Sequence, residues 1–534
     1  MRATAFRLNV PVYPVARKAR SYRGVPLVVG WAYNRESPLN ALPMISREQF
    51  DAYAAQGHTR IPLVREVFSD LDTPLSVYLK LADGPYTFLF ESVEGGATWG
   101  RHSIIGLPAR RVYRLRGHEL EVEESGEVVE RRHLDDPLAE IEVLRKQYDV
   151  PRLPGLPDFT GGLVGYFGFE TIGYIEERLA QWDKRDELGT PDVLLMLADE
   201  VAVFDNLKGR LYLIVHADPS RPQAYAEASR RLDALAFRLR QGGVSYPQLL
   251  QPAALDESDF KSSFTREEYE AMVRTAQEYI RAGDIFQVVP SQRLSIGFNA
   301  RPVDVYRALR AMNPSPYMFF IDIGTTQIVG SSPEILVRLK NGRVVLRPIA
   351  GTRRRGKDEA EDTALETELL ADPKERAEHL MLIDLGRNDV GRVSETGTVE
   401  LTESFVVERY SHVMHIVSQV EGNLKGDMSY MDVIKATFPA GTVSGAPKIR
   451  ALEIIQELEP FKRNIYAGAI GWLGWWGDAD TAIAIRTAVI QDGRLHVQAG
   501  GGVVYDSDPG AEWEETMNKG RALFRAVAQA AKGL

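Results

Sequence analysis

Short apolar runs separated by Gly, Pro and Asp turns fill residues 75–215 and predict a β-rich region. Residues 86–90, 193–197 and 211–215 are the clearest of these runs. From about residue 264 onward, helical and strand-like patterns alternate to the end of the chain. Because 534 residues exceed the size at which single hydrophobic cores usually stop growing, we expect two large units or one elaborate unit.

Capping signals and connectors divide the chain into three parts. Residues 1–43 are rich in Arg and contain Glu36 as their only acidic residue, so we expect a disordered basic tail. An organelle transit peptide and a misplaced translation start are open alternatives. A capping box at Ser46 and Gln49 predicts ordered structure from Met44. A connector before the capping box at Thr265 then separates residues 44–260 from residues 264–534.

Composition excludes several classes of protein. The net charge of -10 argues against nucleic acid as a partner, and no apolar run is long enough to cross a membrane. The chain has no cysteine, which excludes disulfides, cysteine metal sites and cysteine nucleophiles. This composition fits a protein of the reducing cytoplasm.

The same acidic pattern begins two predicted helices. Each has an Asp as cap, a Pro at the first helical position, and two Glu on one face. Favourable interaction with the helix dipole explains either pair alone. If the two faces meet, four carboxylates would repel each other unless a divalent cation lay between them, and Mg²⁺ suits such oxygen ligands. The residues are Asp372, Pro373, Glu375 and Glu378 in the first helix, and Asp508, Pro509, Glu512 and Glu515 in the second.

Two strand-like segments carry candidate polar residues. Alternation over residues 481–489 predicts one strand with Arg486 on a face of alanines, where a ligand carboxylate has room to bind; a solvated outer face is the alternative. Residues 500–502 are three consecutive glycines, whose backbone can approach a ligand closely. The strand pattern of residues 410–420 leaves His415 open to a structural role or to acid/base chemistry.

These stretches resemble the chorismate-utilising enzyme family over nearly the whole chain after about residue 65. The motifs are DIFQVVPSQ (284–292), SPE (332–334), PIAGTR (348–353), ERAEH (375–379), DLGRND (384–389) and GTVSGAPK (441–448). The resemblance implies a four-layer αββα fold, in which two packed β-sheets are flanked by helices. It further implies that Glu378 and Glu515 bind Mg²⁺ directly, while Glu375 and Glu512 act largely through waters. The implied substrate-binding residues are Gly351, Thr352, Thr442, Tyr466, Arg486, Gly500, Gly501 and Gly502.

The resemblance also implies the roles of two catalytic residues and the nature of the nucleophile. Glu334 is expected to protonate the departing 4-hydroxyl of chorismate, and His415 to assist elimination of pyruvate. Relatives that add water have a lysine at the position of Gln287, and relatives that make aminodeoxychorismate have one at Ala350. An amide and a methyl group can neither activate water nor form an amine adduct, so the nucleophile is external. Ammonia fits and would give anthranilate, the first step of tryptophan biosynthesis.

Glutamine hydrolysis by the usual route requires a cysteine thiolate, so a separate glutamine amidotransferase subunit is expected to supply the ammonia. Two segments, 90–92 and 313–318, resemble the tryptophan pocket of feedback-inhibited family members. In that pocket Glu91 and Ser92 would hold the polar groups of tryptophan, and Pro316, Tyr317 and Met318 would hold its indole. An ordinary apolar core is the alternative for the second segment.

Three other functions compete with this interpretation. An aminodeoxychorismate-forming enzyme is disfavoured by Ala350, and a non-catalytic regulatory homologue by the intact chemical positions. A glycoside hydrolase using the paired carboxylates lacks an aromatic groove for a sugar.

Overall fold

The computed structural model describes residues 44–93, 100–180, 184–241, 243, 254–410 and 413–534. The basic segment 1–43 lies outside this part of the chain, so the predicted tail is untested. The described residues belong to one compact unit. Among the helices of the described residues, none combines the length and apolar character that a membrane crossing requires.

The first of two large sheets has 11 strands, and every pairing between them is antiparallel. Across the sheet the order is β1 (Ile61–Phe68), β10 (Arg210–Ala217), β9 (Glu200–Asp205), β3 (His102–Gly106), β2 (Thr87–Glu91), β14 (Tyr317–Asp322), β15 (Thr326–Ser332), β24 (Thr487–Gln491), β25 (Arg494–Gly500), β13 (Ser291–Gly297) and β11 (Lys261–Ser262).

The second large sheet has 12 strands and is also antiparallel. Its order is β18 (Ile349–Arg354), β20 (Val413–Asn423), β17 (Arg343–Leu346), β16 (Ile335–Lys340), β23 (Ala479–Ile483), β22 (Ala469–Gly474), β7 (Gly162–Phe167), β8 (Val193–Ala198), β4 (Arg111–Arg116), β5 (Glu119–Glu124) and β6 (Glu127–His133), and β19 (Glu400–Arg409) pairs with β20. A short ribbon joins β12 (Gln287–Val288) to β21 (Gly445–Ala446).

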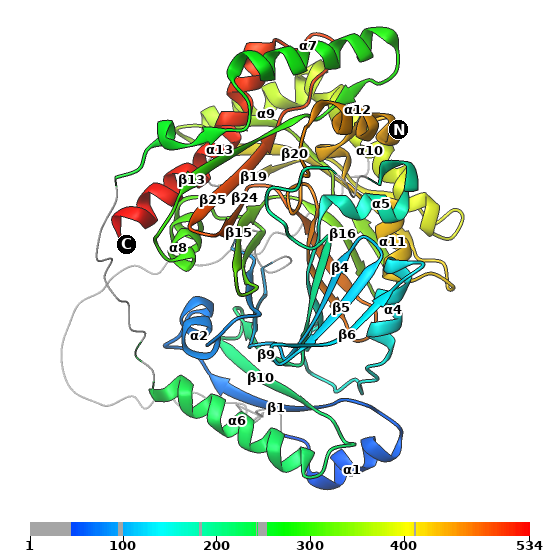
Figure 1. Cartoon of the computed structure of the whole chain (residues 1–534), viewed down its shortest axis with the longest axis vertical. Helices are drawn as coiled ribbons and strands as arrows, with labels where there is room; N and C mark the ends of the chain where they lie inside the picture. Colours follow the sequence, from blue (N-terminus) through cyan, green and yellow to red (C-terminus); the bar gives the residue numbers. More distant parts are fainter. Residues whose placement is uncertain (1–43, 94–99, 181–183, 242, 244–253, 411–412) are drawn as a thin grey trace, which may run out of the picture. The chain divides into compact units, whose positions relative to one another are not determined.

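Helices cover the outer faces of both sheets, which confirms the predicted four-layer αββα arrangement (Figure 1). One apolar cluster, which includes Val164, Phe319 and Ile470, fills the space between the sheets. The first sheet packs against α1 (Arg47–Ala55), α2 (Pro74–Leu81), α6 (Ala224–Gln241), α8 (Pro302–Met312) and α13 (Pro509–Lys532). The second packs against α4 (Pro137–Lys146), α5 (Ile172–Ile175), α9 (Glu359–Ala371), α10 (Pro373–Val393) and α11 (Tyr430–Thr437). Of the remaining helices, α7 (Arg266–Ala282) packs against α13, and α12 (Lys448–Leu458) packs against the β12–β21 ribbon.

The helix boundaries follow local signals in the sequence. Thr265 caps α7 by accepting a hydrogen bond from the amide of Glu268, and α7 ends at Gly283 with a left-handed φ of 85°. Asp372 and Asp508 cap α10 and α13 in the same way, each followed by a Pro. The predicted starts of all three helices are confirmed.

The boundary near residue 260 does not separate the two regions in space. In the first sheet β2, from residues 44–260, pairs directly with β14 from residues 264–534. In the second sheet β7 pairs with β22 in the same manner. The family resemblance implies a regulatory, tryptophan-binding role for residues 44–260 and a chorismate-binding catalytic role for residues 264–534. This assignment stays a prediction, and the two regions share one structural framework.

Candidate functional site

The candidate site forms where the chain passes from one sheet to the other. Glu334 lies between β15 of the first sheet and β16 of the second, and Arg486 lies between β23 and β24. The two passages run side by side, because the Ile483 amide bonds to the Glu334 carbonyl at 3.0 Å and the Ser331 amide to the Arg486 carbonyl at 3.1 Å. The predicted single strand over residues 481–489 is therefore wrong. Alternation continues on both sides of the break, but the chain changes sheets.

Arg486 lies at this passage in a left-handed backbone conformation, with φ of 49°. Such a conformation is costly for a residue with a side chain and often marks a functional site. Burial lowers the pKa of the guanidinium, which also interacts with Tyr410 and Glu334. In the described part of the chain it forms no ion pair. A half-buried guanidinium of this kind can bind the carboxylate of a ligand.

Glu334 is a buried carboxyl group that stays protonated at neutral pH. It is 5% exposed, and the hydroxyl of Thr442 donates a hydrogen bond of 2.8 Å to it. Burial raises the pKa of Glu334 to about 8, although this hydrogen bond and Arg486 act in the opposite direction. A carboxylic acid protonated near pH 7 can serve as a general acid.

His415 in β20 lies directly opposite Thr352 in β18. Its Nδ1 is 2.9 Å from the carbonyl oxygen of Gly351 and 3.1 Å from the hydroxyl of Thr352. Burial lowers the pKa of His415 to about 4, so the ring is neutral. Because a carbonyl oxygen only accepts, Nδ1 carries the proton and Nε2 keeps a lone pair. This arrangement can accept a proton and favours the acid/base interpretation over a purely structural one.

The three glycines that begin at the last residue of β25 leave no room for side chains. A Cβ atom on Gly500 would lie 2.8 Å from the Pro290 carbonyl oxygen and 2.9 Å from the Tyr466 hydroxyl. One on Gly502 would lie 2.5 Å from Nε2 of Gln287. The side-chain amide of Gln287 therefore lies against this glycine segment.

The two acidic helix starts meet. Burial raises the pKa of Glu378, and Glu375 and Glu515 raise it further. Burial likewise raises the pKa of Glu512, with Glu515 as an additional cause. Two glycines of the predicted substrate-binding set lie close to these carboxylates. A Cβ atom on Gly351 would be 3.2 Å from a carboxylate oxygen of Glu375, and one on Gly501 would be 2.8 Å from a carboxylate oxygen of Glu512. We call Glu375, Glu378, Glu512 and Glu515 the acidic quartet.

Two basic residues bind half of the acidic quartet. Arg353 contacts Glu375 at 3.1 Å, and Lys519 contacts Glu515 at 2.8 Å. Among the described residues, no three His, Asp or Glu side chains converge as metal ligands. Arg353 also pairs with Asp372 and Glu368, and neither Glu378 nor Glu512 forms an ion pair in the described part of the chain.

The acidic quartet fits a divalent cation on a separate observation. Glu512 is only 8% exposed, and its Oε2 atom is buried without a hydrogen-bond partner. A buried, unsatisfied carboxylate oxygen is rare in proteins and requires an explanation. An oxygen-binding cation of charge +2 would satisfy this atom and the excess charge together.

Sequence reasoning did not assign roles to Arg353 and Lys519. The ion pair of Lys519 could have been predicted, since Lys519 lies four residues after Glu515 on the same helix, where side chains of opposite charge meet. Arg353 lies inside a quoted motif, but its three acidic partners come from α9 and the start of α10. Those partners become visible only in the fold.

The residues of the predicted tryptophan pocket gather at a second place. A cavity of about 340 Å³ between the sheets is lined by all five of them, together with Arg338, Trp472 and Asp480. The hydroxyl of Tyr317 donates a hydrogen bond of 3.1 Å to Asp480, which also pairs with Arg338. This cavity contains none of the predicted catalytic residues.

Two of the five side chains point away from this cavity. Glu91 and Met318 are paired across β2 and β14, and both face the helical side of the first sheet. The Glu91 carboxylate is bound by Arg310 at 3.0 and 3.1 Å and by the hydroxyl of Tyr306. Neighbouring residues of a strand face opposite sides, so Tyr317 and Met318 cannot both enter the cavity. The expected contact between Glu91 and a ligand ammonium group is not supported.

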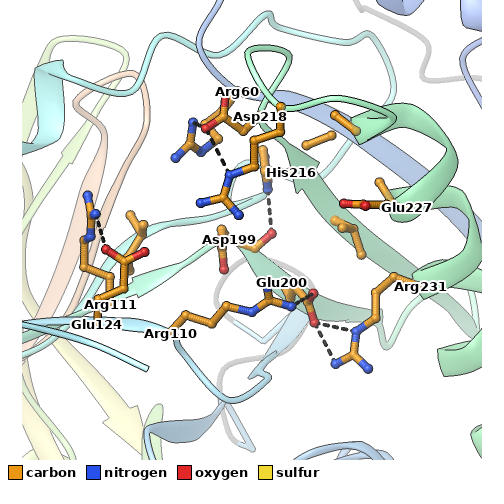
Figure 2. A pocket seen from close by; sticks show the side chains of 16 residues that line it. Arg60, Arg110, Arg111, Glu124, Asp199, Glu200, His216, Asp218, Glu227 and Arg231 are labelled. Carbon is orange, nitrogen blue, oxygen red and sulfur yellow. Dashed lines mark hydrogen bonds and ion pairs between the residues drawn. The ribbon is translucent and has the colours of Figure 1, made fainter. Parts of the chain in front are cut away.

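A further cavity, of about 180 Å³, lies where α6 covers the ends of β8 and β10 (Figure 2). Its charged residues bind one another: Arg60 pairs with Asp218 at 3.1 Å, and Arg231 with Glu200 at 2.7 Å. Arg111 pairs with Glu124 at 2.5 Å. None of the predicted site residues lines this cavity, and its paired arginines do not form an anion site.

Comparison with known proteins gives a consistent result. A family model described as chorismate binding enzyme matches residues 93–525. Anthranilate synthase component 1 of Pseudomonas aeruginosa is 58% identical over 487 residues, covering 91% of this chain and 99% of the relative. The protein of that name from Neisseria meningitidis serogroup A is 55% identical over 494 residues, covering 92% and 100%.

Solved structures agree with the sequence relatives. Anthranilate synthase component I from Streptococcus pneumoniae has a TM-score of 0.72 at 40% identity, covering 86% of this chain and 99% of that one. The menaquinone-specific isochorismate synthase of Escherichia coli has a TM-score of 0.65 at 19% identity, covering 90% and 98%, and shows the fold alone. The chain thus belongs to the chorismate binding enzymes and, within them, to the anthranilate synthase component 1 family.

Proposed function

We propose that this chain converts chorismate and ammonia into anthranilate and pyruvate, as the large subunit of an anthranilate synthase. One observation carries the proposal: the uncharged side-chain amide of Gln287 packs against Gly502, which belongs to the predicted substrate-binding set. An amide cannot deprotonate water, and Ala350 offers no amine for an aminodeoxychorismate-type adduct. A non-catalytic role is disfavoured because Glu334 and His415 have pKa values that suit a general acid and a general base near neutral pH.

Each catalytic residue has a task in this reaction. Arg486 binds a carboxylate of chorismate, and Glu334 gives its proton to the 4-hydroxyl, which leaves as water. Ammonia bonds to C2 as the hydroxyl departs. Loss of pyruvate and a ring proton then yields anthranilate, with Nε2 of His415 placed to assist the elimination. Both residues are in the required protonation state near pH 7, because burial raises the pKa of Glu334 to about 8 and lowers that of His415 to about 4.

We further propose that the acidic quartet binds Mg²⁺, with Glu378 and Glu515 as direct ligands. Glu375 and Glu512 would act largely through waters. The cation would supply positive charge to the ring carboxylate of chorismate.

The supply of ammonia gives the most direct test. The purified chain with chorismate, Mg²⁺ and an ammonium salt should form fluorescent anthranilate at alkaline pH. With glutamine at neutral pH it should form none, because a chain without cysteine lacks the usual thiolate nucleophile. Glutamine should support the reaction once a separate glutaminase subunit is added. Release of glutamate by the chain alone is the control for contaminating glutaminase, and glutamine use without that contamination would contradict the proposal.

We also propose that tryptophan binds in the cavity between the sheets and inhibits the enzyme. Its indole would lie among Pro316, Tyr317 and Trp472, and its charged groups near Ser92, Arg338 and Asp480. A neighbouring cavity of about 190 Å³ shares Pro316 and Tyr317 and reaches Pro333, next to Glu334, and Tyr410, whose ring packs against His415. Movement of Tyr317 on tryptophan binding would therefore reach the catalytic residues.

Replacing Ser92 by Ala should weaken tryptophan inhibition about fivefold, since one hydrogen bond contributes roughly 1 kcal/mol. Activity without tryptophan should stay nearly unchanged. The measurement is the tryptophan concentration that halves the rate, compared with Ser258→Ala, whose hydroxyl binds Asp256 at the surface. Normal inhibition combined with lost activity in Ser92→Ala would place the pocket elsewhere.

A further inference from the structure

Lys519 links the acidic quartet to the glycine segment of the candidate site. It lies one helical turn after Glu515 on α13, and its Nζ atom is 2.8 Å from Oε1 of Glu515. The same ammonium donates a hydrogen bond of 2.9 Å to the carbonyl oxygen of Gly500. Its charge also acts on Glu334, Glu378 and Glu512.

We propose that Lys519 competes with the divalent cation for Glu515 and thereby sets the affinity of the acidic quartet for that cation. The inference rests on the proposed function, which assigns the cation to this cluster. Lys519 is in this sense a positioning residue, since it acts through Glu515.

The competition follows from charge and distance. A Mg²⁺ ligand oxygen lies about 2.1 Å from the ion, and the ammonium is already 2.8 Å from the same carboxylate. Two cations on one carboxylate repel each other, although solvent weakens the repulsion here because the Lys519 and Glu515 side chains are 47% and 48% exposed. The ammonium occupies Oε1 of Glu515 and weakens the attraction of the whole carboxylate for a second cation, so direct binding of the ion to Glu515 favours movement of the ammonium away from it.

Lys519 is better suited to such an exchange than Arg353. Arg353 binds Glu375 with only one of its nitrogens, while Asp372 and Glu368 hold the others at 2.8 and 2.9 Å. Lys519 has a flexible stem and, besides Glu515, the Gly500 carbonyl to hold it. After it leaves Glu515, its ammonium would remain beside the glycine segment.

The test compares Lys519→Met with Lys374→Met in the full chain. Both lysines are exposed and both substitutions remove one positive charge that acts on Glu378 and Glu512, but Lys374 forms no ion pair in the described part of the chain. Titration with MgCl₂ in a calorimeter, without substrate, gives the Mg²⁺ affinity. Lys519→Met should bind Mg²⁺ about tenfold more tightly than the natural chain, and Lys374→Met less than about threefold.

Melting temperatures provide a second measurement. In EDTA, Lys519→Met should melt below the natural chain, because Glu515 loses its counter-charge, and saturating Mg²⁺ should remove this difference. A purely structural lysine would lower the melting temperature equally in both conditions. The proposal is overturned if Lys519→Met binds Mg²⁺ no more tightly than Lys374→Met, or more weakly than the natural chain.

Anthranilate formation by the natural chain is measured separately. If the natural chain forms anthranilate and binds Mg²⁺ but the two variants bind it equally, the inference about Lys519 fails and the proposed function stands. If the natural chain forms no anthranilate with ammonium and Mg²⁺, the proposed function itself fails.

Discussion

Replacing Glu378 by Gln should lower the rate of anthranilate formation by at least about a thousandfold, and Glu515→Gln should have the same effect. Loss of a direct carboxylate ligand removes charge stabilisation of several kcal/mol, and about 4 kcal/mol corresponds to a factor of a thousand. The fold should survive, because Glu378 is crowded by Glu375 and Glu515, which together with burial raise its pKa. Removing its charge relieves that repulsion, so the melting temperature should be unchanged or higher.

The matched control is Glu514→Gln. Glu514 lies on the same helix beside Glu515, but its exposed carboxylate pairs with Arg266 at 3.1 Å. This variant should keep near-normal activity, since exposed ion pairs contribute little. Full Mg²⁺-dependent activity in Glu378→Gln or Glu515→Gln would remove the metal assignment.

Sequence predicted the parts of the site that depend on local structure. The Asp-Pro starts of α10 and α13 cap their helices as predicted, because capping involves only residues two or three positions apart. The spacing of the Glu pairs then places each pair on one helical face. The sequence could not predict that the two helical faces meet, because α10 and α13 begin more than a hundred residues apart.

Features that depend on distant partners were not predictable in this way. Alternation over residues 481–489 is real, but a period of two does not reveal that the chain changes sheets at Arg486. Glu91 was grouped with Ser92 because they are adjacent in sequence. Its carboxylate instead binds Arg310, which lies 219 residues further along the chain. The same limitation hid the contacts of Arg353 with three carboxylates.

The acidity of Glu334 gives the last prediction. Its pKa is raised to about 8, so the protonated, proton-donating form is present below this pH and is lost as the pH rises through it. The value of kcat/KM for chorismate should therefore fall above about pH 8, because this parameter reports ionisation of the free enzyme. The concentration of free NH₃ must be held constant across the series, since ammonia itself becomes more abundant at alkaline pH.

Two variants distinguish Glu334 from other groups that titrate in this range. Glu334→Gln should lose at least about a hundredfold in rate, the usual contribution of a general acid, and its residual activity should show no decline near pH 8. Thr442→Val removes the hydrogen bond of 2.8 Å that lowers the pKa of Glu334, so its decline should move to higher pH. A merely structural role for Glu334 would not move the profile in Thr442→Val. If the decline persists unchanged in both variants, another residue is the acid.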